Sequence, residues 1–109
     1  MQPPTRPLTA EEHAAAALAN ALASQNVSVD VHDGYGLALV SVWVGLVVWC
    51  HGGRYWWRSA WDARRQRVIY AWHPFIDPAR AADRIALRYA QLRKAHPFPT
   101  QVTGAPPCA

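Results

Sequence analysis

The chain has 109 residues, of which 51% are hydrophobic, and a formal net charge of +4. This length matches one domain with a modest core, and the apolar fraction is too high for a disordered chain. We expect a flexible N-terminal segment over residues 1–8, a single α+β domain over 9–95 and a Pro-rich tail over 96–109.

Cysteine usage and the lack of a leader-like segment favour the cytoplasm. Cys50 lies in an apolar run and Cys108 in the Pro-rich tail, so the two do not resemble a disulfide framework. The N-terminus has no apolar signal region. The uncharged stretch 37–50 is shorter than the roughly 20 residues that a membrane helix needs. The sequence therefore predicts a cytoplasmic protein without a membrane segment.

Thr9 and Glu12 have the spacing of a capping box, which predicts a helix from there to about Ser24. From residue 27 the apolar period changes to two, as in a half-buried strand. Asp33-Gly34 is a hairpin signal; a turn there pairs Val29 with Ala38.

Two further hairpins are expected downstream. Gly52-Gly53 pairs Trp49 with Trp56 and His51 with Arg54. A third turn, within 62–65, is expected to bring the following strand back along its predecessor. The expected pairs across that turn are Trp57 with Tyr70, Tyr55 with Trp72 and Arg54 with His73.

The stretch Leu37–Cys50 is either one long strand or two strands joined at Val44-Gly45. A two-residue hairpin of the favoured types would force β-branched Val44 to positive φ, so one strand bent at Gly45 is favoured. Asp77-Pro78 then starts a second helix, which runs to about Ala95. Together these elements predict an α+β two-layer sandwich, with a four-stranded antiparallel meander and both helices on one face.

The second face of this sheet is the candidate binding site, because contiguous exposed apolar patches usually mark interaction sites. It combines tryptophan with basic side chains. Its expected members are Trp43, Trp49, His51, Arg54, Trp56, Arg58 and His73.

The residue types on this face suit more than one partner. Tryptophan and arginine favour a protein partner or a second copy of the chain. Aromatic platforms beside arginine also suit nucleic acid. Two other interpretations remain: a helix or the tail covers this face, or the face binds a small ligand.

A second basic feature lies on the C-terminal helix. Arg80, Arg84 and Arg88 are spaced to line one side of it, where they can contact phosphates or an acidic partner. The alternative is an ordinary solvated helix face.

No group of residues predicts catalysis. Cys50 and His51 are adjacent on a strand and so point to opposite faces. His51 and His73 beside Arg54 lack the carboxylate or thiolate that would complete a metal site. We therefore expect no enzyme, cofactor, metal or small-molecule substrate. The sequence predicts a small cytoplasmic binding or regulatory protein that binds a protein partner or itself, with nucleic-acid binding as the alternative.

Overall fold

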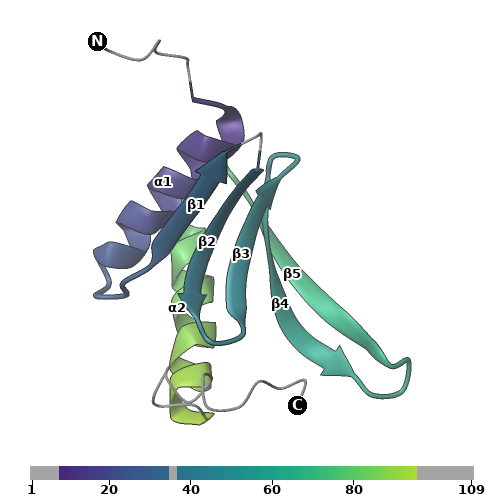
Figure 1. The fold of residues 1–109 in the computed structure, drawn as a ribbon. Helices are drawn as coiled ribbons and strands as arrows, with labels where there is room; N and C mark the ends of the chain where they lie inside the picture. Colours follow the sequence, from purple (N-terminus) through teal and green to yellow (C-terminus); the bar gives the residue numbers. More distant parts are fainter. Residues whose placement is uncertain (1–7, 35–36, 96–109) are drawn as a thin grey trace, which may run out of the picture.

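A computed structural model of the chain describes residues 8–34 and 37–95. Two helices flank a five-stranded antiparallel sheet whose strands lie in chain order (Figure 1). The predicted α+β fold is confirmed, although the sheet has five strands and not four. Most of the expected N-terminal segment and all of the tail lie outside the described residues. The elements are α1 (Ala10–Ala23), β1 (Asp30–Gly34), β2 (Leu37–Trp43), β3 (Leu46–His51), β4 (Arg54–Asp62), β5 (Arg67–Pro74) and α2 (Pro78–Ala95).

Both helices lie on one face of the sheet, as predicted, and the far end of the β4–β5 hairpin extends beyond them (Figure 1). The core forms between the two layers, where Leu18 and Leu22 of α1 and Ile85 of α2 meet inward strand residues. Tyr55 of β4 is fully buried there, and its hydroxyl donates to the Ala14 carbonyl of α1 over 2.7 Å. This hydrogen bond ties the sheet to the N-terminal helix.

Both helices begin where the sequence predicts. The Thr9 hydroxyl accepts from the Glu12 amide, and the Glu12 carboxylate accepts from the Thr9 amide, which completes the capping box. At the start of α2, the Asp77 carboxylate accepts from the Arg80 amide. Neither described helix combines the length and the apolar character that crossing a membrane requires.

The prediction of one continuous strand over 37–50 is wrong. β2 and β3 are separate antiparallel strands joined at Val44-Gly45, and Trp43 pairs with Leu46. Only Gly45 has positive φ, at 76°, while Val44 does not. Because the turn needs this conformation at its second position alone, the β-branched residue meets no penalty.

The turn between β1 and β2 lies two residues later than predicted. Gly34 pairs with Leu37 and Val31 with Val40, so the turn falls on residues 35–36, which are not described. The resulting register differs from the predicted one by four residues. An even shift leaves every side chain on its predicted face, because strand side chains alternate with period two.

The Gly52-Gly53 hairpin is confirmed, with Trp49 opposite Trp56 and His51 opposite Arg54. Both glycines have positive φ, as a type I′ hairpin turn requires. The predicted register of β4 with β5 is wrong by one residue. Trp56 pairs with Trp72, and a register shift follows between Arg58 and Ala60. An odd shift transfers all of the affected β5 side chains to the other face.

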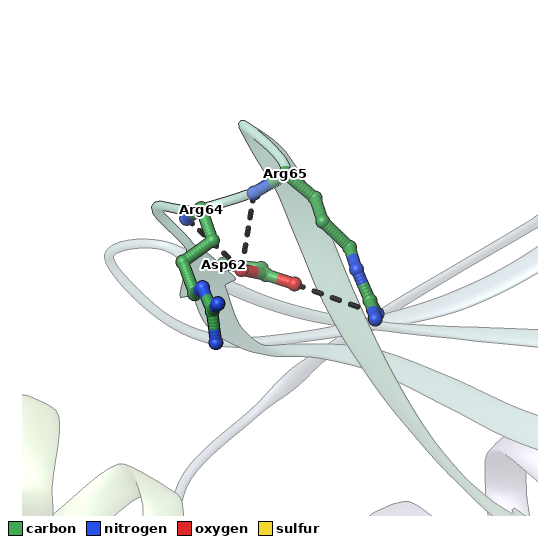
Figure 2. Close-up of polar contacts among 3 residues, drawn as sticks. All are labelled: Asp62, Arg64 and Arg65. Atoms are coloured by element: carbon green, nitrogen blue, oxygen red, sulfur yellow. Dashed lines mark hydrogen bonds and ion pairs between the residues drawn. The ribbon is translucent and has the colours of Figure 1, made fainter.

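The tip of the β4–β5 hairpin is closed by Asp62 (Figure 2). One oxygen of its carboxylate accepts from the Arg64 and Arg65 amides, and the other lies 3.8 Å from the Arg65 guanidinium. Gln66 adopts the left-handed backbone conformation, with φ at 53°, and so completes the chain reversal. Side chain and backbone thus determine the turn together, as in other aspartate-initiated turns.

Candidate functional site

The sheet face turned away from the helices, here called the open face, carries two rows of side chains that cross all five strands. Residues paired across antiparallel strands share a face. The aromatic row consists of His32, Leu39, Trp49, Trp56 and Trp72. The mixed row consists of Asp30, Ser41, Val47, Arg58 and Tyr70; Arg58 belongs to it because it follows Trp57, the partner of Val48.

Large aromatic side chains on this face are exposed. Trp49 is 45% exposed, Trp72 44% and Tyr70 57%. Trp49 belongs to β3 and the other two to β5, with Trp56 of β4 between them. A contiguous aromatic surface of this kind is uncommon on a protein that works alone.

Arg54 and two tryptophans form an ordered cluster at one end of the open face. The rings of Trp56 and Trp72 lie 6.3 Å apart at 44°. The Arg54 guanidinium lies 4.3 Å from the Trp72 ring centre and 5.8 Å from that of Trp56. The Trp56 indole N–H donates to the His51 carbonyl over 3.2 Å. These contacts hold the rings in place before any partner binds, which lowers the entropy cost of binding.

A shallow hollow of about 390 Å³ lies beside this cluster. It is lined by Trp49, His51, Trp56 and Tyr70. Its walls are almost wholly apolar, so it suits an apolar or aromatic side chain. The neighbouring guanidiniums of Arg54 and Arg58 disfavour a cationic occupant.

Charge is unevenly distributed over the open face. Among the described strand residues, Asp30 on β1 is its only carboxylate, whereas Arg54 and Arg58 both lie on β4. Neither the Asp30 carboxylate nor the Arg58 guanidinium forms a hydrogen bond or ion pair with another described residue. The face is therefore acidic at one edge and basic toward the other.

Five of the seven predicted site residues lie together on the open face: Trp49, His51, Arg54, Trp56 and Arg58. The placement of Trp43 there is wrong. The bulge between Ser41 and Trp43 turns its ring to the helices, where it meets Tyr89 edge-on at 5.7 Å and Arg93 at 4.7 Å.

The placement of His73 on the open face is also wrong. It pairs with Tyr55 and so lies on the helix-covered face, with its Nδ1 atom 3.2 Å from the Arg84 guanidinium. The same one-residue shift brings Trp72 and Tyr70 to the open face, whereas the predicted pairs with Tyr55 and Trp57 would have placed them on the helix-covered face. Trp61, 54% exposed, joins this face through its pairing with Val68. No local sequence signal marks the bulge responsible.

The three arginines of α2 do not form a uniform row of free charges. Arg80 lies 3.7 Å from Asp77. Arg84 donates to the Trp72 carbonyl over 2.6 Å and stacks 5.0 Å from the Trp57 ring centre. Arg88 donates to Gln91. Each guanidinium is thus engaged by its own neighbours.

Cys50 and His51 lie on opposite faces, as predicted: Cys50 is buried and His51 exposed. Among the described residues, no three histidine, cysteine or acidic side chains are close enough to hold a metal ion. Burial raises the pKa of the Cys50 thiol to about 12, and the Glu11 carboxylate contributes in the same direction. A thiol in this state is neutral and a poor nucleophile at neutral pH.

The buried thiol predicts a loss of stability in alkali. The ordinary thiol pKa is 9.0. Above that pH the unfolded chain releases the Cys50 proton while the folded chain retains it, so the free energy of unfolding falls as pH rises toward 12. The expected loss is at most about 1.4 kcal/mol per pH unit. Urea unfolding between about pH 7 and 10.5, on either side of the ordinary thiol pKa, measures it, and Cys50→Ala should show a shallower decline.

Burial also raises the pKa of Tyr55, which adds to this decline above its ordinary value of 10.0 in both proteins. The Cys50 thiolate adds to the rise in the Tyr55 pKa, so the difference in slope between wild type and Cys50→Ala reports the thiol together with its effect on Tyr55. Equal slopes would show that Cys50 ionises in the folded chain as readily as in the unfolded one.

No protein-family model, curated protein or solved structure matches this chain at a significant level.

Proposed function

We propose that this chain is a small, non-catalytic cytoplasmic protein of regulatory type whose open face binds a protein partner. The observation that carries the proposal is the aromatic row, in which exposed Trp49 and Trp72 flank half-buried Trp56 on three adjacent strands. Both helices cover the opposite face, so these rings stabilise no core of the described chain. Tryptophan and arginine are the residue types that dominate binding energy at protein interfaces.

Nucleic-acid binding is the second candidate, because Arg58 is unpaired among the described residues and lies beside exposed rings. Two features make it weaker. Arg54 already lies over Trp72, which occupies one ring surface that a base would need. The α2 arginines that would extend the phosphate track are engaged elsewhere, and Arg84 lies on the helix-covered side.

Site-specific photo-crosslinking tests the proposal and captures whichever partner occupies the face. A benzophenone amino acid replaces Tyr70 on the open face, or Leu87 on α2 as the control, since both are well exposed, at 57% and 64%. We expect a protein adduct from position 70, none from position 87, and loss of the adduct when Trp56→Ala is added. Mass spectrometry of the adduct gives the mass of the partner.

The other outcomes decide against the proposal. A nucleic-acid adduct at position 70, with binding that weakens steeply in salt, would favour the second candidate. Equal labelling at both positions, or none at either, would show that the open face is not a specific interface.

A further inference from the structure

We propose that the partner of the open face is a second copy of this chain, packed sheet on sheet about a two-fold axis that runs along β3. This inference rests on the proposed function and names its partner. In such a dimer the same surface serves both copies, so each contact occurs twice. Two antiparallel sheets packed face to face lie about 10 Å apart, and their interdigitated side chains fill the space between them.

The charge distribution of the open face selects this axis. An axis along β3, in the plane between the two sheets, stacks β1 of one copy over β5 of the other, and β2 over β4. Asp30 then faces the mixed-row position of β5, and Arg58 of the second copy lies diagonally across from it, one strand spacing of about 4.8 Å to the side, where a long arginine side chain reaches the carboxylate. Both are exposed and form no ion pair with described residues of their own chain.

An axis perpendicular to the strands is disfavoured by the same charges. It would stack β4 on β4 and so bring Arg54 and Arg58 of the two copies together without an acidic residue between them. Like charges brought together at an interface oppose association. Of these two axes, only the one along β3 brings the acidic edge of one copy toward the basic strands of the other.

The aromatic row supports the same arrangement. An axis along β3 places Trp49 opposite its own counterpart, at the centre of the interface. Leu39 of β2 then faces Trp56 of the second copy, and His32 of β1 faces Trp72. Each exposed ring is covered by an apolar or aromatic side chain, or by an imidazole.

The size of the sheet predicts a reversible dimer. Five strands about 4.8 Å apart are roughly 20 Å wide, and six residues of strand are about 20 Å long. The flat footprint is thus roughly 400 Å² per copy, about half of the roughly 800 Å² per partner that a stable interface buries, which predicts weak association. We expect a dimer whose population depends on protein concentration.

A charge-reversal experiment tests the inference. Asp30→Arg makes both contacts Arg against Arg, and Arg58→Asp makes both Asp against Asp, so each variant alone should dimerise at least roughly tenfold more weakly than wild type. In an equimolar mixture of the two variants, both contacts can again join Arg and Asp in one hetero-dimer. The mixture should therefore regain dimers in sedimentation equilibrium or light scattering over a concentration series.

The matched control is Asp33→Arg. Asp33 also lies on β1 and is exposed, but its partner Ala38 places it on the helix-covered face. This variant makes the same charge change on the same strand and should dimerise like wild type. Circular dichroism of all three variants verifies that the fold is retained.

Three results would overturn the inference. A wild-type monomer at every concentration, including after removal of residues 96–109, excludes the second copy. Dimers that both single variants leave intact exclude the open face as the contact. Dimers weakened in the single variants but not regained in the mixture exclude this axis. A crosslinked protein of another mass at position 70 would still support the proposed function.

Discussion

Replacing Tyr55 by alanine is expected to lower the free energy of unfolding by about 3–5 kcal/mol, the range for large aromatic residues removed from cores. Tyr55 is fully buried, and its ring centre lies 5.0 Å from that of Phe75. Total stabilities of domains are about 5–15 kcal/mol, so this variant approaches the limit of folding. Urea denaturation followed by circular dichroism measures the loss.

Two further variants separate the contributions of Tyr55. Tyr55→Phe retains the ring and removes only the hydroxyl that donates to the Ala14 carbonyl, so we expect a loss of about 1 kcal/mol. Tyr70→Ala removes the same side chain from the open face, where it is 57% exposed, and should cost less than about 1 kcal/mol. Similar losses at positions 55 and 70 would contradict the assignment of the two faces.

Replacing Trp49 by alanine is expected to weaken association through the open face by at least about 2 kcal/mol, or roughly 30-fold in Kd. In the proposed dimer Trp49 lies at the interface centre and is lost from both copies at once. Because the ring is 45% exposed in the single chain, stability should change by less than about 1 kcal/mol. Sedimentation equilibrium gives the Kd, and urea denaturation gives the stability.

The control for Trp49 is Trp61→Ala. Trp61 is 54% exposed on the same face but near the hairpin tip, away from the centre of the sheet. It should change Kd by less than about threefold, as peripheral residues usually do. Equal effects at the two positions would indicate nonspecific apolar association, and unfolding of Trp49→Ala would show that the ring belongs to the core.

Elements with local signals were predicted well. The capping box at Thr9 and Glu12 depends on residues three apart, and the Gly52-Gly53 turn on two adjacent residues. In both cases the hydrogen bonds that define the structure form within the segment itself, so packing against distant parts of the chain does not decide them.

Elements that depend on strand register were predicted less well. The bulge near Trp43 and the shift between Arg58 and Ala60 each alter the face of later side chains. As a result, Trp43 and His73 were wrongly assigned to the candidate site, and Tyr70 and Trp72, which do belong to it, were missed. A bulge leaves the period-two pattern of each strand almost intact, so the sequence does not reveal it.

The sequence by itself determined the fold class, the ends of both helices and the presence of a sheet face rich in tryptophan and arginine. Alternation of apolar residues, caps and glycine turns act over a few residues, and these were sufficient. Only the tertiary structure decided which aromatic rings share the open face, and that Asp30 and Arg58 lie in one row across it. The physical reason is that neighbouring strands select their register by packing against the helices, which joins residues far apart in the chain.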